Sequence, residues 1–513
     1  MIEVEVHQQL RAFLREQGEP YWPHHLTIAR LVGRALRLQR SALIQVGSPS
    51  AYHGRHRLSY LAPIVIWSGP VILVAPEAVQ QRLLRVEIPR LCEWMQVSKP
   101  IRADDHWPSP DFRGLLLTSP MAWLEDYLTQ QGRFPAGIPT IVDNADELEE
   151  WTRQQLTISL RAQDWHDLML AYPNQGELIR NTRIQLTRAI FQHPANPYGC
   201  ALIDQPEREI LNRLHIALHS FDLTVSPKTW RYFWQQLYAE ATLVWAEIDR
   251  HQGQFALHCA PLEISPLLRN IWSRQPVVLI GGALDLETEA TLYRQQVGLG
   301  DVTCLKFAPD RHAETIRLYL PDGVPMPNTP EFQSALVQQI HRLIVASSVA
   351  SGLIVLIIED LPLKAQIASI LASEFGSRVQ VETSSVDDNG ILITGWEFWQ
   401  QHQRFLSIPQ LLVVATLPIP SLEDPRVAGR VAHYKRLRQD WFRLYLLPEA
   451  LNKLQRAIAP VRGQQGVVAL LDSRVLHRSY GHQVLLALSP YARVNYIDPS
   501  LFTEPDHPIL EGF

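Results

Sequence analysis

The sequence predicts an α/β protein built on parallel sheets, with a helical insertion. Short apolar, β-branched runs alternate with helical stretches, as buried parallel strands do; near the C-terminus they occupy residues 391–394, 411–415 and 466–471. The chain of 513 residues is too long for one core and suggests two to four domains. Residues from 151 to about 265 lack this strand pattern and are predicted to be helical throughout.

Composition places the chain among ordinary globular proteins, with 46% hydrophobic and 19% charged residues. The net charge of −5 gives no global attraction for nucleic acid, so any such binding needs a local basic groove. No apolar run is long enough for a membrane span, and no secretory signal is evident at the start. The cysteines (Cys92, Cys200, Cys259 and Cys304) lie far apart without metal-ligand spacing, so we expect free thiols in a reduced, cytoplasmic setting.

Further apolar runs precede the insertion and follow it. Predicted strands occupy residues 42–46, 71–75, 114–119, 138–143, 275–284 and 352–358. Residues 58–66 and 331–348 are predicted to be helices, and residues 98–112 a polar, Pro-rich loop.

Short motifs punctuate these elements in a distinctive order. In the C-terminal hundred residues they are Phe398-Trp399, Leu417-Pro418, Asp424-Pro425, Pro448 with Ala450, Asp472 with Arg474, and Tyr480-Gly481. Tyr60-Leu61 with Pro63 and Ile88-Pro89 with Leu91 punctuate the N-terminal part. This order resembles the DinG/XPD-type superfamily 2 DNA helicases. The resemblance implies two RecA-like domains of the P-loop NTPase type and an arch-like helical insertion. The first domain comprises residues 1–158 and 266–290, the insertion residues 159–265, and the second domain residues 291–513.

The phosphate-binding loop of that family, G-x-x-x-x-G-K-[ST], departs from its pattern here. Small residues let backbone N–H groups wrap a phosphate, while the Lys reaches phosphate oxygens and the hydroxyl binds Mg²⁺. Gly47 and Gly54 are separated by six residues instead of four. Counting from Gly54 places Arg55 and His56 at the Lys and hydroxyl positions; counting back from Tyr60 places His56 and Arg57 there. Gly47, Gly54, Arg55 and His56 are therefore the candidate nucleotide-binding residues, without the Lys or the hydroxyl.

The catalytic motifs also survive only in part. Of the family's D-E-A-H, Asp143 is kept, whereas Asn144 replaces the Glu, and an amide cannot act as a general base. The alternative interpretation is a plain strand followed by an acidic helix start. In the family's Q-x-x-G-R-x-x-R, Gln455 and Arg462 remain and Ala459 replaces the first Arg. Asp143, Gln455 and Arg462 are therefore the catalytic remnants.

Other motifs of the family also differ in this sequence. The adenine-reading Y-x-R-P-x-Q has become 21–25 (YWPHH), the coupling S-A-T has become 281–283 (GGA), and acids at 359–360 stand where a hydroxyl-bearing turn is expected. Four cluster-binding cysteines are expected after the second strand, but only Cys92 is present there, so we predict no iron–sulfur cluster.

Two surfaces are candidates for nucleic acid. The basic segment 426–443 carries Arg430, Lys435, Arg436 and Arg438, which either contact phosphates or form a solvated face. An aromatic stripe at helical spacing (Trp230, Phe233, Trp234 and Tyr238) is expected to pack in a core, with base stacking as the alternative.

The leading hypothesis is a catalytically silent relative of these helicases that binds single-stranded DNA, another nucleic acid or a protein partner. No cofactor is assigned under this hypothesis. An alternative is an active ATP-dependent DNA helicase with divergent motifs, which needs ATP and Mg²⁺. A third is a scaffold that binds neither nucleotide nor DNA.

Overall fold

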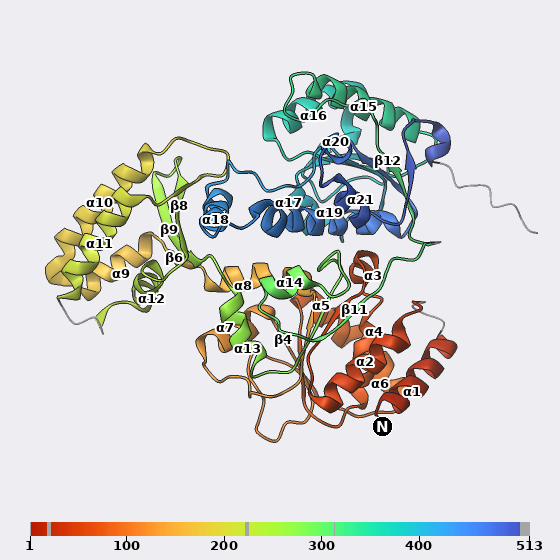
Figure 1. Ribbon diagram of the computed structural model, residues 1–513, viewed down its shortest axis with the longest axis horizontal. Helices are drawn as coiled ribbons and strands as arrows, with labels where there is room; N and C mark the ends of the chain where they lie inside the picture. The colour runs from red at the N-terminus through yellow and green to blue at the C-terminus, as the bar shows by residue number, and fades with distance from the viewer. Residues whose placement is uncertain (1, 18–21, 221–224, 312, 503–513) are drawn as a thin grey trace, which may run out of the picture.

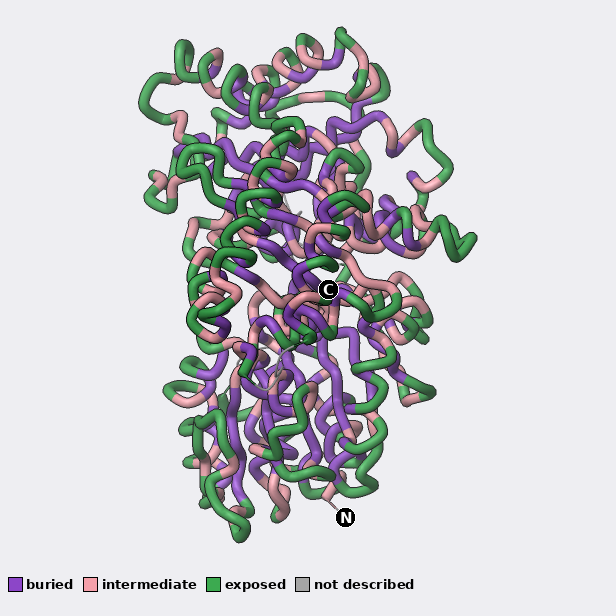
Figure 2. Tube along the Cα trace, turned by 90° about the vertical axis from the view of Figure 1, so that its left-hand side faces the viewer, coloured by how far each residue is buried: buried purple, intermediate pink, exposed green. Residues whose placement is uncertain are grey.

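The computed structural model describes residues 2–17, 22–220, 225–311 and 313–502, which form two lobes and a projecting insertion (Figure 1). Each lobe contains a seven-stranded sheet in which every pairing is parallel. The buried residues follow these sheets through the middle of each lobe (Figure 2). The predicted α/β class and its two parallel sheets are confirmed.

The sheet of the first lobe has the order β11-β1-β10-β5-β2-β4-β3. Its strands are β1 (Ala42–Gln45), β2 (Val71–Val74), β3 (Ile101–Ala103), β4 (Leu115–Thr118), β5 (Thr140–Asp143), β10 (Val277–Gly281) and β11 (Thr303–Lys306). Because β10 lies between β1 and β5, the carboxyl ends of these three strands adjoin. The segments 47–57, 143–147 and 281–283 therefore meet at one edge of the sheet.

Helices cover both faces of this sheet. Alternate residues of a strand therefore pack in different cores. Ile44 packs in one core and its neighbour Leu43 in the other. The helices are α1 (Ile2–Gln17), α2 (His25–Leu38), α4 (Arg57–Ile66), α5 (Glu77–Arg82), α6 (Ile88–Met95), α7 (Pro120–Thr129), α8 (Leu148–Leu156), α13 (Ser265–Trp272) and α14 (Thr291–Gln296).

The first lobe extends beyond its predicted boundary. Strand β11 was expected within 291–513, but it pairs with β1 at the edge of the first sheet. In α14, Tyr293 packs in a core of the first lobe. A four-residue strand with exposed ends has little apolar signal of its own, and its assignment depends on a partner far away in the sequence. Strand β3 likewise lies in the predicted loop 98–112.

Residues 151–265 were predicted to be helical throughout, and this prediction is wrong. The insertion carries an antiparallel sheet of order β6-β9-β8-β7. Its strands are β6 (Ile158–Leu160), β7 (Cys200–Leu202), β8 (Thr242–Asp249) and β9 (Gln254–Pro261), and its helices are α9 (Ala162–Ala171), α10 (Gly176–Gln192), α11 (Gln205–His219) and α12 (Lys228–Leu237). In β8, Val244, Ala246 and Ile248 are buried and alternate with more exposed residues, the period of a half-buried strand.

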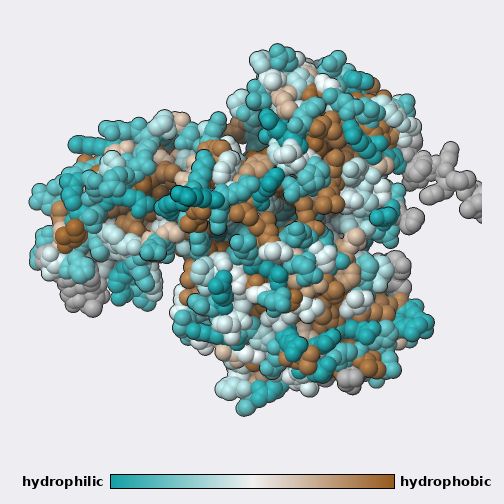
Figure 3. Space-filling view, in the orientation of Figure 1, coloured by the Kyte–Doolittle hydropathy of each residue, from teal (hydrophilic) through white to brown (hydrophobic). Residues whose placement is uncertain are grey.

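One face of this small sheet is packed by the helices of the insertion. Trp230, Phe233 and Trp234 of α12 are buried in that core, which confirms the packing interpretation, while Tyr238 is exposed. The face of the insertion that is visible in Figure 3 is mostly hydrophilic.

The second lobe has the sheet order β14-β15-β13-β16-β17-β12-β18. Its strands are β12 (Ile316–Tyr319), β13 (Leu353–Ile357), β14 (Val379–Val381), β15 (Ile391–Thr394), β16 (Pro409–Val414), β17 (Val467–Leu470) and β18 (Tyr491–Val494). Its helices are α15 (Phe332–Ser347), α16 (Leu361–Phe375), α17 (Trp396–His402), α18 (Pro425–Arg436), α19 (Leu447–Arg462), α20 (Arg474–His477) and α21 (Gly481–Ala487). None of the helices in the described ranges is both long and apolar enough to cross a membrane.

Candidate nucleotide site between the lobes

The segment after β1 forms a short helix, α3 (Ser48–His53), where the resemblance predicts a phosphate loop. Gly47 (φ +81°) and Gly54 (φ +70°) bound it, and both need the left-handed backbone that glycine adopts readily. The Ala51 N–H donates to the Gly47 carbonyl at 3.0 Å, and the Arg55 N–H donates to the Ser50 carbonyl at 3.0 Å. These two N–H groups therefore donate to carbonyls of the same segment and are not available to a ligand.

Asp143, at the end of β5, is enclosed by side chains that follow α3. Its carboxylate accepts hydrogen bonds from His56 Nε2 at 2.9 Å, Tyr60 Oη at 3.0 Å and Arg57 Nε at 3.4 Å. The Asn144 N–H adds a fourth contact at 3.0 Å. All of these side chains except that of Asn144 are buried. Both oxygens of Asp143 therefore have protein partners.

The charge state of Asp143 follows from these contacts. Burial alone raises the pKa of a carboxyl group, but the charge and hydrogen bond of His56, with Arg57 and Tyr60, outweigh burial. The pKa of Asp143 consequently lies well below its usual range. An ionised carboxylate that is buried with its counter-ions holds its surroundings together strongly, since removing it leaves unpaired charges behind.

The residues after Asp143 bind the segment after β10 directly. The Asp146 carboxylate accepts the Gly282 N–H at 2.7 Å and the Ala283 N–H at 2.6 Å. A Cβ added to Gly281 would lie 2.7 Å from Asp146 Oδ2, so glycine is needed for this approach. A carboxylate on backbone amides thus links the two segments, although the coupling hydroxyls expected at 281–283 are absent.

The two arginines of α19 have different environments. Arg462, 2% exposed, donates to the carbonyls of Glu314 at 3.1 Å and Pro490 at 3.0 Å, and also to that of Leu488. Burial lowers the pKa of Arg462 to about 10 despite the opposing charge of Glu314. Arg456 crosses to the first lobe and pairs with Glu147 at 2.5 Å. Both guanidinium groups are therefore engaged within the protein.

Helix α3 also contacts the second lobe, with α19 facing it in Figure 1. The Tyr52 hydroxyl donates to the Gln403 carbonyl at 2.9 Å. Arg55 pairs with Glu314 at 2.8 Å, on the segment that leads into β12. A Cβ added to Gly463, just after α19, would lie 2.9 Å from His53 Nε2. The segment at the phosphate-loop position is thus part of the interface between the lobes.

Stability of this interface should depend on pH through His53. Burial, then the charges of Arg55 and Arg82, lower the pKa of His53 from 6.5 to about 4. Since the unfolded state binds the proton more readily, folding loses stability as pH falls from about 6.5 towards 4. Between pH 7 and pH 5 the expected loss is at most about 2 kcal/mol, and solvent screening reduces it because the imidazole is partly exposed. Urea unfolding at both values should show it in the wild type and not in His53→Gln; equal losses in the two proteins would contradict the assignment.

The predicted adenine region is filled by aromatic side chains. Trp22 is buried, with its ring 5.8 Å from that of Phe307, and the His24 ring lies 4.5 Å from Phe307. His25, at the position of the family's Gln, is buried and bonds Ser59 Oγ at 2.9 Å. Tyr21 lies outside the described residues.

The basic helix α18 packs against β7 and β8 of the insertion on one side, so that Gly429 lies against Leu243. Arg430 is half-buried, donating to Tyr445 Oη at 3.1 Å and lying 3.9 Å from Glu149. The other candidate phosphate-binding residues, Lys435, Arg436 and Arg438, are exposed. The predicted basic set therefore divides into Arg430, a half-buried cation with partners in the protein, and an exposed cluster of Lys435, Arg436 and Arg438.

Metal-ligand clusters are absent from the described ranges, where no group of three or more His, Cys, Asp or Glu side chains could hold an ion. All four cysteines are free thiols.

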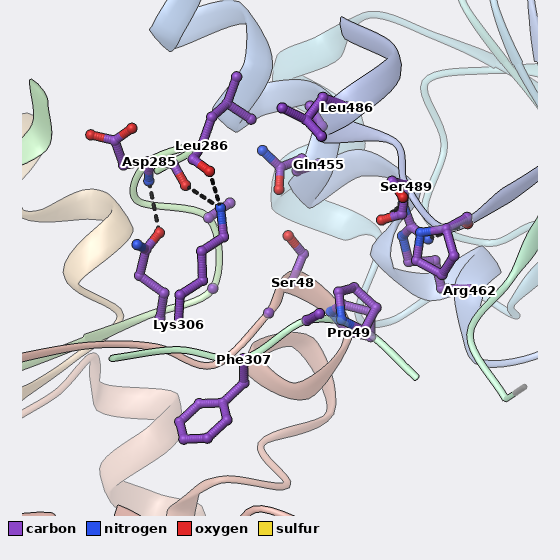
Figure 4. A pocket seen from close by; sticks show the side chains of 18 of the residues that line it. Ser48, Pro49, Asp285, Leu286, Lys306, Phe307, Gln455, Arg462, Leu486 and Ser489 are labelled. Atoms are coloured by element: carbon purple, nitrogen blue, oxygen red, sulfur yellow. Dashed lines mark hydrogen bonds between the residues drawn. The ribbon is translucent and has the colours of Figure 1, made fainter. Parts of the chain in front are cut away.

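A pocket of about 200 Å³ remains between the lobes beside α3 (Figure 4). Both candidate residues Gln455 and Arg462 line it, together with Gly47. The structure thus brings Gly47, Gln455 and Arg462 to one pocket and encloses Asp143 separately with His56.

Comparison with known proteins agrees with this architecture. An XPD helicase structure aligns with 93% of this chain and all of its own chain, at a TM-score of 0.57 and 12% identity. A structure of apo XPD gives 0.56 over 91% of this chain at 14% identity, and Xpd4 of S. tokodaii gives 0.56 over 92% at 12%. The chain has the fold of the XPD helicases. The two lobes that contain the parallel sheets are accordingly RecA-like domains.

A curated sequence relative points the same way. The ATP-dependent DNA helicase YoaA of Haemophilus influenzae is 21% identical over 257 residues, which span 47% of this chain and 40% of YoaA. No family model matches the chain. The resemblance to DinG/XPD-type helicases is therefore confirmed in fold and in part of the sequence.

Proposed function

We propose that this XPD-like protein does not hydrolyse ATP and serves as a non-catalytic module that binds single-stranded nucleic acid. The observation that carries the proposal is the Asp143 carboxylate, whose oxygens are occupied by His56, Arg57 and Tyr60. Each oxygen that could face a Mg²⁺ shell already accepts a hydrogen bond from a buried side chain. A cytoplasmic location is part of the same proposal.

The other positions at which this fold would contact a nucleotide also support the absence of ATP hydrolysis. ATP and Mg²⁺ need a loop of free amides, an ammonium and a hydroxyl, and α3 supplies none of these in that arrangement. Arg462 is bound to carbonyls, and Trp22 with His24 fills the base region. The residues present do not fit the nucleotide, so no hydrolytic step is assigned to them.

Measurement of phosphate release, with ATP, Mg²⁺ and single-stranded DNA, tests the proposal directly. We expect release at the rate of the protein-free control, and no rise in melting temperature at millimolar ATP, because a ligand that binds the native state raises its melting temperature. ATPase activity that co-elutes with the protein on gel filtration and saturates with ATP would establish the active-helicase alternative instead.

The nucleic-acid half of the proposal depends on the exposed cations Lys435, Arg436 and Arg438. Their phosphate contacts should release counterions, so retention on single-stranded DNA should weaken as salt rises. Replacing all three by Gln should abolish retention. The control variant Arg430→Gln should retain binding, because it removes a cation that is already engaged by Tyr445. Retention unchanged in the triple variant would refute a role for this cluster.

A second candidate is a protein-docking scaffold, which one set of contacts favours. In the second lobe the Glu359 carboxylate accepts the Trp396 N–H at 3.0 Å, and Glu382 accepts the Gly395 N–H at 3.1 Å. These acids occupy backbone amides at the start of α17, where a phosphate group would otherwise be favoured. Absence of any salt-dependent DNA retention in the wild type would favour the scaffold.

A further inference from the structure

The sheet of the insertion carries polar side chains on the face that turns away from its helices. Successive side chains of a strand point to opposite faces, and in β8 the residues on either side of Trp245 are buried in the helical core. Trp245 and Glu247 therefore lie on the other face. His258 of β9 is paired directly with Trp245, and Ser159 of β6 is paired directly with His258. The neighbouring strands β6, β9 and β8 (Figure 1) thus bring a hydroxyl, an imidazole and a carboxylate to one face.

The imidazole of His258 lies between the other two groups. The Ser159 hydroxyl oxygen is 2.8 Å from Nδ1, and a Glu247 carboxylate oxygen is 3.3 Å from Nε2. The Trp245 ring stacks on the imidazole, with 5.1 Å between the ring centroids and an angle of 17° between the planes. The ring nitrogen that faces a carboxylate carries the proton, so Nδ1 is left to accept the hydrogen bond of the Ser159 hydroxyl.

The His258 imidazole is neutral near pH 7. His258 is 9% exposed, and this burial lowers its pKa from 6.5 despite the opposing charge of Glu247. The positive charges of Arg161 and Arg426 lower the pKa further. A neutral imidazole bonded to a hydroxyl can take the proton of that hydroxyl, which is the role of a general base.

Positive charge and solvent access are available at the same place. Ser159 is half-buried, and Arg161, two residues further along an extended backbone, is exposed on the same face. Glu247 is also exposed, so a dissolved molecule can reach this side of the sheet. The charges of Arg161 and Arg426, both of which act on His258, would stabilise an oxyanion that forms when a hydroxyl attacks a carbonyl group.

We propose that Ser159 is a nucleophile, activated by His258, that accepts the acyl group of small acyl esters. The Ser159 oxygen bonds to the acyl carbon while its proton passes to Nδ1 of His258. The ester C–O bond breaks, and the leaving alcohol takes that proton. Water then attacks the acyl-serine in the same way, giving its proton to Nδ1, from which Ser159 recovers it. Glu247 and Trp245 act as positioning residues for the imidazole. This site needs neither nucleotide nor nucleic acid, so it stands independently of the proposed function.

Labelling of the full chain with a fluorophosphonate, which phosphonylates activated serines with loss of fluoride, tests the site. Mass spectrometry should locate the adduct on the peptide that contains Ser159, in native protein and not after denaturation in urea. Hydrolysis of p-nitrophenyl acetate by the wild type should exceed that by Ser159→Ala. An unmodified Ser159 in the native protein, or equal hydrolysis by these two proteins, would overturn the proposal.

Variants of the cluster distinguish a nucleophile from a structural hydrogen bond. His258→Gln should slow labelling about a hundredfold, the lower range for loss of a general base. Ser159→Cys keeps a nucleophile, and acetate from the ester should then be found on the thiol. Ser369→Ala, which removes an exposed hydroxyl on α16, should behave as the wild type. Unchanged labelling in His258→Gln would refute activation by the imidazole.

The dependence of labelling on pH tests the role of Glu247. The wild-type rate should fall only below about pH 6.5, where the imidazole becomes protonated. Because the negative charge of Glu247 raises the pKa of His258, Glu247→Gln should move this fall to lower pH. A fall at the same pH in both proteins would contradict the assignment of His258, held by Glu247, as the base.

Discussion

Asp143→Ala is expected to destabilise the first lobe by about 3–5 kcal/mol, the usual result of removing one partner from a buried charge pair. Arg57 is 3% exposed, and without the carboxylate its charge is buried unpaired, while His56, 1% exposed, loses a hydrogen-bond partner. Equilibrium urea unfolding, followed by tryptophan fluorescence, measures the loss. An active ATPase would lose turnover at this position while keeping most of its stability.

A double-mutant cycle between His56 and Asp143 separates their coupling from other effects. The single variants His56→Gln and Asp143→Asn, and the double variant, should give an interaction energy of about 1–3 kcal/mol for residues in direct contact. Additive effects would show that the pair does not act as a unit. A stability loss in Asp143→Ala below about 1 kcal/mol, the level of an exposed ion pair, would contradict the closed cluster.

Arg462→Met is the second substitution with a large expected effect, again about 3–5 kcal/mol. Each carbonyl that loses a buried donor costs about 1–3 kcal/mol, and Arg462 serves those of Glu314, Leu488 and Pro490. The carbonyls join the entry to β12 with the entry to β18, so the variant should loosen that edge of the second lobe. Hydrogen exchange in β12 and β18 locates the change.

Arg456→Met, on the same helix, is the matched control. Its guanidinium and the carboxylate of its partner Glu147 are partly exposed, so the loss of this ion pair should cost less than about 1 kcal/mol. A larger loss in Arg456→Met than in Arg462→Met would show that the contact between lobes, and not the buried carbonyl cluster, is the main role of α19.

The predictable part of the fold is the part with strong local patterns. Strands such as β15 and β13 are continuous apolar runs, and their pattern needs no knowledge of partners. The sheet of the insertion has a weaker pattern. Its strand β8 is half-buried, and a single alternating run beside long helices carries little weight until β9 is known to pair with it.

The site was predictable only as a list of altered positions. The sequence shows that the Lys and the Glu are missing, and it cannot show that His56 reaches Asp143, which lies 87 residues away. Helix α3 was missed for a related reason. A six-residue segment that begins Ser48-Pro49 and ends before Gly54 has helix-boundary signals, yet two bounding glycines are equally typical of a phosphate loop.

The carboxylates bonded to backbone amides have a consequence for how this molecule meets charged ligands. Asp146 on Gly282 and Ala283, like Glu382 on Gly395, is joined to its amides through the chain itself. An intramolecular group competes at a high effective concentration, which a dissolved competitor rarely matches. Dissolved anions, free nucleotides among them, would therefore not displace these acids from their amides at cellular concentrations.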